Sequence, residues 1–420
     1  MAEMHTLLID RLGQHGDGIA LTPDRPVYVA GALAGETVVA AVSGDRGRLV
    51  SVEIASANRV VPSCPLFGRC GGCAVQHLAG PAAAAWKREL VVAALAHAGL
   101  ETEVAATLPA HGLGRRRVVL HLRRGEAGWE AGFMAARSHD LVPVPDCPLL
   151  VPGLGEASTV ALAVAGALGG AKPLDVQVTA TSGGLDVDVR GHGPASPSRR
   201  TAMTTAAIRD DLARLSIHGD IIVERRPPLV SVDGVAVLPP PGGFLQATEA
   251  GEAALGELVR HAATGARVVA DLFAGVGPFA LRLARTAAVH AVETDAAALV
   301  ALDRAVRGAA DRRAIVVERR DLFRRPLLTS ELARFDTVVF DPPRAGAEMQ
   351  ARQLAASTVA RVIGVSCNPA TFARDARILV DGGYRLVAVT PVDQFLHSAH
   401  VELVGVFEKP RPSRARRILG

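Results

Sequence analysis

The chain has 420 residues, of which 49% are hydrophobic and 21% are charged, and its formal net charge at pH 7 is +4. This length predicts two or three domains, and the composition excludes a largely disordered protein. The longest apolar run, residues 160–171, is too short and too rich in glycine to span a bilayer. The N-terminus lacks the pattern of a signal peptide. We therefore expect a cytoplasmic protein without a membrane partner, and no protein partner is evident.

Residues 1–58 have the pattern of a small β-barrel. Short runs rich in β-branched residues are separated by Gly, Asp and Pro turn signals, and no helical period is present. Five such strands are the size of an OB-like module, a fold that often binds nucleic acid. The fold by itself does not establish that function.

Four of the five cysteines are grouped after this segment, as Cys64, Cys70, Cys73 and the more distant Cys147. Disulfides are rare in a reducing compartment, so grouped cysteines there indicate metal binding or catalysis. Pro and Gly between the first three thiols allow the backbone to wrap tightly around a ligand. Thiolates suit either zinc, with His77 as a further ligand, or an iron–sulfur cluster, and the sequence leaves both open.

The middle of the chain predicts a mostly antiparallel domain. A helical pattern runs from Trp86 to Gly99, and residues 115–235 then alternate like strands. Arginine is concentrated at residues 114–124 and 411–420. Such clusters suit phosphate, because the guanidinium donates paired hydrogen bonds, but they are equally typical of a solvated surface.

The pattern changes after the Pro-rich turn at residues 238–251, where strands begin to alternate with helices. This alternation predicts a parallel, doubly wound sheet. We therefore expect a multidomain α/β protein. Its predicted parts are an N-terminal OB-like β-barrel at 1–58, a central mostly antiparallel α+β domain with the four-cysteine site at 59–240, and a C-terminal Rossmann-like domain at 241–420.

A Gly-rich turn follows a strand that ends in Asp271. Gly275 and Gly277 let the backbone approach a ligand at the end of the sheet where ligands bind in such folds. Glu293, at the end of the next strand, is spaced for ribose hydroxyls, and Asp321 follows the third strand, where an adenine would lie. The spacing favours a nucleoside cofactor without a pyrophosphate, such as S-adenosylmethionine, over a simple packing turn.

A second turn, Asp-Pro-Pro-Arg at residues 341–344, follows a buried strand. Proline fixes the backbone and lacks an N–H, so the turn is rigid. We expect it to aim Asp341 and Arg344 into the same crevice.

Cys367 lies between a predicted strand and a predicted helix that starts after Asn368 and Pro369. A cysteine in a buried strand is usually a small hydrophobic residue, but this sulfur is expected at the rim of the sheet. Near a helix N-terminus and cations, the pKa of a thiol falls, which would give a thiolate nucleophile at neutral pH.

Glu402 lies beside the last strand and is a candidate general base, with His397 and His400 nearby. A carboxylate needs a pKa raised by burial to act as a base near neutral pH. The alternative is a solvated strand carboxylate, and His400 would then be a packed histidine.

Together these motifs resemble the RNA uracil-5 methyltransferases, a family that uses S-adenosylmethionine to make 5-methyluridine. The resemblance covers the whole chain. It rests on FLQ at 244–246, the Gly-rich turn with Glu293, FDPPRAG at 340–346, SCNPATFARD at 366–375 and HVE at 400–402. It implies that the C-terminal domain is a class I methyltransferase domain and that residues 1–58 are a TRAM domain. The spacing of Cys64, Cys70, Cys73 and Cys147 is similar to that of the ribosomal-RNA branch of the family, which holds a [4Fe–4S] cluster.

The resemblance also implies roles for individual residues. Cys367 would add to carbon 6 of uracil, and Glu402 would remove the proton from carbon 5 after methyl transfer. Phe244 would stack on a base, as aromatic side chains do on unpaired RNA. The cofactor would be lined by Gln246, Phe273, Gly275, Gly277, Glu293, Asp321 and Asp341. The RNA partner implied is 23S ribosomal RNA rather than transfer RNA.

The chain departs from the family pattern at a few positions. Pro278 stands where Asn is usual after the Gly-rich turn, which affects one expected cofactor contact. Leu396 replaces the usual Pro, and Ser398 stands where Thr is commoner. None of these changes falls on Cys367 or Glu402.

Two other readings differ in kind. An exocyclic-amine methyltransferase also uses Asp-Pro-Pro, but it needs no cysteine and carries an aromatic residue where this chain has Arg344. A non-catalytic RNA-binding iron–sulfur protein on the same scaffold would bind RNA without turnover.

Overall fold

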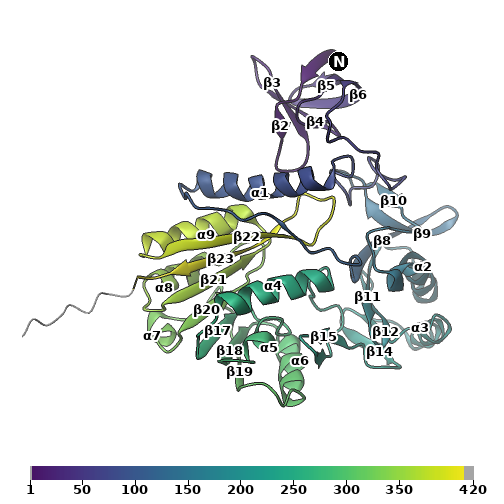
Figure 1. Ribbon diagram of the computed structural model, residues 1–420. Helices are drawn as coiled ribbons and strands as arrows, with labels where there is room; N and C mark the ends of the chain where they lie inside the picture. The colour runs from purple at the N-terminus through teal and green to yellow at the C-terminus, as the bar shows by residue number, and fades with distance from the viewer. Residues whose placement is uncertain (1, 411–420) are drawn as a thin grey trace, which may run out of the picture.

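The structure, a computed structural model, describes residues 2–410, so the arginine cluster at 411–420 lies outside it. Three sheets of six, seven and eight strands follow one another, and a two-stranded hairpin lies between the second and third (Figure 1). This arrangement confirms the expected multidomain α/β fold. Within residues 2–410 no helix combines the length and hydropathy needed to cross a bilayer.

The N-terminal sheet has strand order β1-β5-β6-β4-β3-β2. Its members are β1 Glu3–Leu8, β2 Arg11–Leu12, β3 Gly18–Leu21, β4 Pro26–Ala30, β5 Thr37–Ser43 and β6 Arg46–Ile54. Alternate side chains such as Val27 and Val29 point into a small apolar core. The sequence predicted five strands, and the sixth is the two-residue strand β2, which is too short to give an alternating pattern.

The central sheet has order β10-β9-β8-β11-β12-β13-β14, and its pairs are antiparallel except for β12 with β13. It consists of β8 Arg117–Gly125, β9 Gly128–Met134, β10 Leu141–Pro143, β11 Leu174–Thr181, β12 Gly184–Arg190, β13 Arg214–Ile217 and β14 Asp220–Glu224. Helices α2 Ala157–Leu168 and α3 Pro197–Arg209 share its hydrophobic core, and the short 3-10 helix η1 Pro152–Leu154 precedes α2. The mostly antiparallel prediction is confirmed.

The C-terminal sheet has order β19-β18-β17-β20-β21-β23-β22-β7. Its strands are β7 Leu108–Pro109, β17 Val268–Leu272, β18 Ala288–Glu293, β19 Ile315–Arg319, β20 Thr337–Phe340, β21 Arg361–Ser366, β22 Arg385–Asp393 and β23 Glu402–Glu408. Strands β17 to β21 are parallel, whereas β23 runs antiparallel between β21 and β22. The first residue of β23 therefore lies at the same edge as the last residue of β21.

Helices cover both faces of this sheet, which is why central strands such as β20 and β21 are buried along nearly their whole length (Figure 1). One core contains side chains of α4 Glu249–Ala262, α5 Ala280–Leu283 and α6 Ala296–Arg307. The other contains side chains of α1 Gly80–His97, α7 Thr329–Leu332, α8 Glu348–Ala355 and α9 Pro369–Asp381. Successive residues of β17 alternate between them, with Val269 in the first and Ala270 in the second.

Two segments from the predicted central domain also join this core. Helix α1 packs against α9 and β22, and the hairpin of β15 Val230–Val232 and β16 Val235–Val237 packs against α6. The domain limits at residues 58 and 240 remain a prediction, and the hydrophobic cores do not divide at those positions.

Candidate active site

The Gly-rich turn leaves β17 at the carboxyl edge of the parallel strands. Phe273, Gly275 and Gly277 have φ of 63°, 53° and 91°, a region that favours glycine. A Cβ on Gly277 would lie 2.4 Å from Leu302, whereas nothing lies within 4 Å of the Cβ position of Gly275. Packing therefore requires Gly277, and the space beside Gly275 is open for a ligand.

Glu293 fastens this turn to the end of β18. Its Oε2 accepts a hydrogen bond from the Gly275 N–H at 3.0 Å, and its Oε1 accepts from the N–H groups of Thr294 and Asp295 at 2.6 and 2.8 Å. Asp321 follows β19 and accepts from the Phe323 N–H at 3.0 Å. The sequence predicted that Glu293 and Asp321 lie at this edge of the sheet, and the structure has both residues there.

Two residues near this turn received no role from the sequence. Phe323 lies with its ring 5.5 Å from that of Phe273, and it is 47% exposed. Asp271 is fully buried, and neither of its carboxylate oxygens has a hydrogen-bond partner among the described residues. Burial, together with the nearby Asp341, raises the pKa of Asp271 well above its ordinary value. A buried, unpaired carboxyl beside an open turn is suited to a cationic ligand group.

Cys367 follows the last residue of β21 and precedes α9, as expected. Asn368 caps α9 by accepting from the Ala370 N–H at 3.1 Å. Its side-chain amide also donates to the Arg344 carbonyl at 3.2 Å, and Thr371 donates to the same carbonyl at 3.1 Å. These bonds hold the Asp-Pro-Pro-Arg turn beside the cysteine, so the two sequence motifs form one wall.

Glu402 faces this wall because of the strand register. Ser366 of β21 pairs with Leu403 of β23, so Cys367 and Glu402 are neighbours just beyond the end of the ladder. Glu402 is 4% exposed, and burial raises its pKa to about 8, with the charge of Asp341 adding to the effect. The expected burial is confirmed, and the alternative of a solvated carboxylate is wrong. Burial likewise raises the pKa of Asp341 to about 7.

The electrostatics of Cys367 differ from the expectation. Burial and the neighbouring Glu402 and Asp341 raise the pKa of its thiol to about 11. Arg344 acts in the opposite direction but is outweighed. The predicted fall in the thiol pKa is therefore wrong for the protein without ligands, because the sequence could not show that two carboxyl groups face the sulfur.

A buried pair of glutamines connects Glu402 to the FLQ motif. Gln394, which follows β22 and is 1% exposed, donates from Nε2 to Oε1 of Gln246 at 2.7 Å and to Oε1 of Glu402 at 3.1 Å. Gln246 is 5% exposed, and its carbonyl accepts from Arg116 at 3.1 Å. Sequence reasoning found Gln246 and missed Gln394, whose only signal was its position just after a strand and eight residues before Glu402.

The aromatic residue of the FLQ motif is outside the core. Phe244 is 67% exposed, and the guanidinium of Arg117 lies 5.1 Å from its ring centre. A ring held by an arginine at the surface is available for stacking on a base. The structure thus brings the predicted nucleophile, base and cofactor residues to one edge and leaves Phe244 on the surface.

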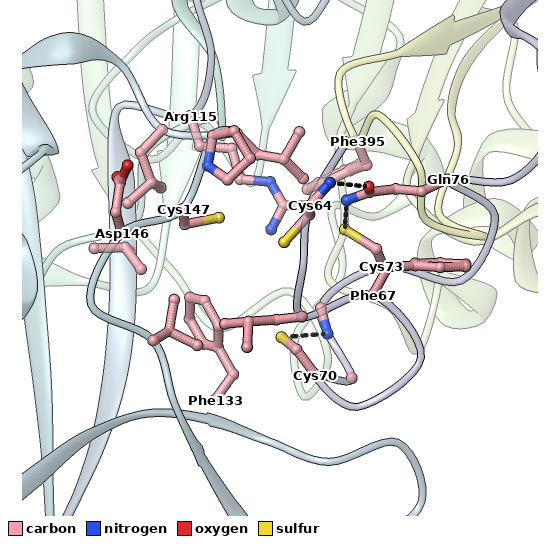
Figure 2. Close-up of a pocket in the computed structure, with 18 of the residues that line it drawn as sticks. Cys64, Phe67, Cys70, Cys73, Gln76, Arg115, Phe133, Asp146, Cys147 and Phe395 are labelled. Carbon is pink, nitrogen blue, oxygen red and sulfur yellow. Dashed lines mark hydrogen bonds between the residues drawn. The ribbon is translucent and has the colours of Figure 1, made fainter. Parts of the chain in front are cut away.

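The four remaining cysteines line one cavity of about 420 Å³. Figure 2 shows the sulfurs of Cys64, Cys70, Cys73 and Cys147 directed into the same space, with Arg115 between them. All four are free thiols. The Cys73 sulfur accepts from Gln76 Nε2 at 3.3 Å, and the Cys70 sulfur accepts from the Gly72 N–H at 3.4 Å. Burial raises the pKa of Cys73 and Cys147.

Zinc fits this cavity poorly. The sulfurs of a tetrahedral zinc site lie about 3.8 Å apart, given Zn–S bonds of about 2.3 Å. Among residues 2–410, no three His, Cys, Asp or Glu side chains are grouped closely enough to hold a metal ion. His77 is not in the lining of the cavity; its buried ring lies 5.3 Å from Phe67, and burial lowers its pKa to about 4.

The cysteine segment is bonded directly to the loop that precedes Glu402. The N–H groups of Ala74 and Val75 both donate to the His397 carbonyl, at 2.7 and 3.0 Å. The guanidinium of Arg115 also lies 5.8 Å from the centre of the Phe395 ring. The cavity and the active-site edge therefore share the loop 394–401.

Comparison with known proteins defines the class. The family model described as tRNA (Uracil-5-)-methyltransferase matches residues 258–410. An uncharacterized RNA methyltransferase of Agrobacterium fabrum is 47% identical over 412 residues, which cover 96% of this chain and 99% of that protein. The 23S rRNA (uracil(1939)-C(5))-methyltransferase RlmD of Pseudomonas fluorescens is 35% identical over 424 residues, covering 96% of this chain and 93% of RlmD.

Among solved structures, the Pyrococcus abyssi tRNA (uracil-54, C5)-methyltransferase in complex with S-adenosyl-L-homocysteine has the same fold. It superposes with a TM-score of 0.70 at 22% identity and covers 96% of this chain and 100% of that chain. The chain belongs to the family of S-adenosylmethionine-dependent RNA uracil-5 methyltransferases. This membership decides against an exocyclic-amine methyltransferase and against a non-catalytic RNA-binding protein.

Proposed function

We propose that this enzyme makes 5-methyluridine in 23S ribosomal RNA, with Cys367 as the nucleophile and Glu402 as the general base. The observation that carries the assignment is the strand register, which makes these two residues neighbours at the carboxyl edge. Both are at least half-buried, and each lies close enough to Asp341 for its charge to raise their pKa values.

The arrangement suits covalent catalysis on a pyrimidine. Carbon 5 of uracil is a poor nucleophile until a thiolate adds to carbon 6 and leaves enolate character on carbon 5. Carbon 5 then takes the methyl group, Glu402 removes the carbon 5 proton, and the electron pair of that C–H bond expels the Cys367 thiolate. The C–S bond that formed in the first step is thereby broken, and the thiol is regenerated.

This order sets the protonation states that the two groups need. The thiol of Cys367, with a pKa of about 11, must lose its proton to solvent before addition, and Glu402, with a pKa of about 8, must be a carboxylate when the carbon 5 proton is removed. Arg344 lowers the pKa of both groups and so favours their charged forms. Asp341 would hold the uracil edge by hydrogen bonding.

S-adenosylmethionine would supply a methyl group on a positively charged sulfonium. The open turn at Gly275, with Gly277, would accommodate it, and the paired rings of Phe273 and Phe323 offer an apolar surface for its adenine. Asp271 would offer its unpaired carboxyl to the amino group of the cofactor. The remaining contacts would come from Gln246, Glu293, Asp321 and Asp341.

Two of these residues, Glu293 and Asp321, already accept hydrogen bonds within the protein. All the oxygen atoms of Glu293 already accept backbone hydrogen bonds, so its contact with ribose hydroxyls would use remaining lone pairs. Oδ1 of Asp321 accepts from the N–H groups of Phe323 and Arg324, and its Oδ2 lies 3.5 Å from Nε of Arg324.

We propose that the cavity formed by Cys64, Cys70, Cys73 and Cys147 holds a [4Fe–4S] cluster. Four cysteine thiolates are the usual ligands of such a cluster, and the four sulfurs here line one cavity of about 420 Å³. The N–H donors on two of the sulfurs and the nearby Arg115 would stabilise thiolate ligands. Its role would be to fix the loop 394–401 and the RNA-binding surface, since methyl transfer by this route needs no electrons.

The choice of 23S over transfer RNA rests on the whole-chain similarity to RlmD and on the four-cysteine cavity. The N-terminal β-sheet would act as a TRAM domain and bind RNA together with Phe244. Transfer RNA is the alternative substrate, and the name of the matching family model favours it.

The test is transfer of labelled methyl groups to unmodified ribosomal and transfer RNA, with the intact enzyme and Cys367→Ala. Label in 5-methyluridine of 23S ribosomal RNA, lost in Cys367→Ala, is the expected result. Label in transfer RNA alone would move the enzyme to the other substrate. Label that persists in Cys367→Ala would contradict covalent catalysis by this residue.

A further inference from the structure

Both the N–H donors and the carbonyl oxygen of the Gln394 side chain take part in hydrogen bonds. Its two N–H donors go to Oε1 of Gln246 and Oε1 of Glu402, at 2.7 and 3.1 Å, and its Oε1 accepts from the Thr248 N–H at 3.4 Å. Rotating the amide by half a turn would set its carbonyl oxygen against two other oxygens. The hydrogen-bond network therefore favours this orientation while Glu402 is ionised.

The fold also fixes where this amide lies. Val392 of β22 pairs with Glu402 of β23, so Gln394 extends just past the base in the antiparallel ladder. Asp393 is held by the buried Lys87 of α1 at 2.6 Å, and the same ammonium donates to the Phe395 carbonyl at 2.8 Å. The residues on both sides of Gln394 are thus anchored to α1.

We propose that Gln394 is a positioning residue that assigns different tasks to the two oxygens of Glu402. It holds Oε1 as a hydrogen-bond acceptor, which leaves Oε2 to receive the carbon 5 proton of the methylated uracil. The same amide turns Gln246 so that its own N–H groups are available to the cofactor. This inference rests on the proposed function, because it concerns the proton that Glu402 is expected to remove.

Several charged groups face Glu402. Asp341, at the end of β20, disfavours its carboxylate form, whereas Arg344 and the hydrogen bond from Gln394 favour it. Cys367, just after β21, also interacts with Glu402, and His400 Nε2 lies 3.3 Å from Nη2 of Arg344. Without the hydrogen bond from Gln394, only Arg344 still favours the carboxylate form of Glu402. The pKa of Glu402 therefore rises, and a smaller fraction of this residue is ionised at neutral pH.

The experiment compares Gln394→Met with Gln350→Met, using the full-length enzyme. Gln350 is a matched control, since it is also 1% exposed and its amide is also hydrogen-bonded through both Nε2 and Oε1, but its partner is the backbone of Leu327 and it makes no hydrogen bond to Glu402 or Gln246. Methionine has a similar length and no donor. We expect turnover to fall about 10- to 100-fold in Gln394→Met, as for loss of a hydrogen bond to a charged group.

The diagnostic readout is the covalent protein–RNA adduct that carries the labelled methyl group. If proton removal is slowed after methyl transfer, this adduct accumulates on a denaturing gel in Gln394→Met, and the acid limb of the rate profile moves to higher pH. Neither change is expected in Gln350→Met. If Gln394→Met melts well below the intact enzyme, Gln394→Asn, whose shorter amide cannot span both oxygens, is used in the same assay.

The outcomes separate the two proposals. A Gln394 variant that melts normally but shows no adduct and an unmoved acid limb would overturn the positioning role while leaving the proposed function intact. An intact enzyme that forms no adduct with RNA containing 5-fluorouridine, which cannot release a carbon 5 proton, would instead overturn the proposed function.

Discussion

The active-site cysteine and the four cavity cysteines occupy different environments. Burial of Cys367 and the charges of the neighbouring Glu402 and Asp341 raise the pKa of its thiol. The cavity cysteines have N–H donors on two sulfurs and the guanidinium of Arg115 between them. Permanent metal ligands are thiolates, and these donors and this cation oppose the rise in pKa that burial causes at Cys73 and Cys147.

A catalytic thiol has a different requirement. A thiol held protonated until substrates arrive is protected from oxidation and alkylation in the free enzyme, and binding can then supply the charge that ionises it. Comparing the two regions therefore teaches that carboxyl groups beside Cys367 are compatible with its function as a nucleophile. The predictions below test this contrast.

The largest expected effect is that of Cys367→Ala. Removal of the nucleophile should lower methyl transfer by at least about 10⁴-fold, because carbon 5 then has no route to activation. Iron content and the melting temperature should stay near those of the intact enzyme, since the cavity is separate. Methyl transfer assays on both proteins measure the loss, and residual activity within tenfold of the intact enzyme would contradict the assignment.

Glu402→Gln should separate the two halves of the reaction. The variant keeps Cys367 and can still methylate carbon 5 once, but it cannot remove the proton, so turnover should fall about 10²- to 10⁴-fold. A methylated covalent RNA adduct should then persist. Equal loss of methyl transfer and turnover, with no adduct, would mean that Glu402 acts before the methyl group arrives.

The sequence alone predicted some of the features behind these expected results and not others. The doubly wound sheet and the placement of Cys367, Asp341 and Glu402 at its edge were predictable, because strand–helix alternation and turn residues are local patterns. The thiol pKa of Cys367 was not, because it depends on which side chains from other strands face the sulfur.

Longer-range contacts explain the other differences. Gln394 meets Gln246 across 148 positions in the sequence, and α1 joins the C-terminal core although residues 98–248 separate it from α4. Without homologous sequences, a single chain contains no signal for such pairs. The cavity was predictable only as a group of four thiols; its size and its bonds to the loop 394–401 required the structure.

Cys147→Ser tests the cavity cysteines rather than the active-site cysteine. We expect loss of iron and sulfide, with weaker absorbance near ~400 nm, and a decrease in the free energy of unfolding on the order of 2 kcal/mol. Trapping of 5-fluorouridine RNA by Cys367 should slow, since the cavity segment holds the His397 carbonyl, but it should not stop. Abolished trapping in a folded variant would mean that the cluster acts in the chemistry.

The smallest expected effect concerns the reactivity of the Cys367 thiol towards iodoacetamide. With a pKa of about 11, only about one thousandth of this thiol is ionised at pH 8, so alkylation of the free enzyme should be slow. Glu402 repels the thiolate only when it is itself ionised, above its pKa of about 8. Glu402→Gln should therefore speed alkylation several-fold at pH 9 and hardly at all at pH 7.

Mass spectrometry of the Cys367 peptide measures these rates, with Glu348→Gln as the control, because Glu348 is an exposed carboxylate on α8 that pairs with Arg352. A rate ratio that does not grow with pH would show that burial alone raises the thiol pKa. Fast alkylation of the unchanged enzyme at pH 7 would instead mean that Cys367 is already a thiolate, and the contrast with the cavity cysteines would then disappear.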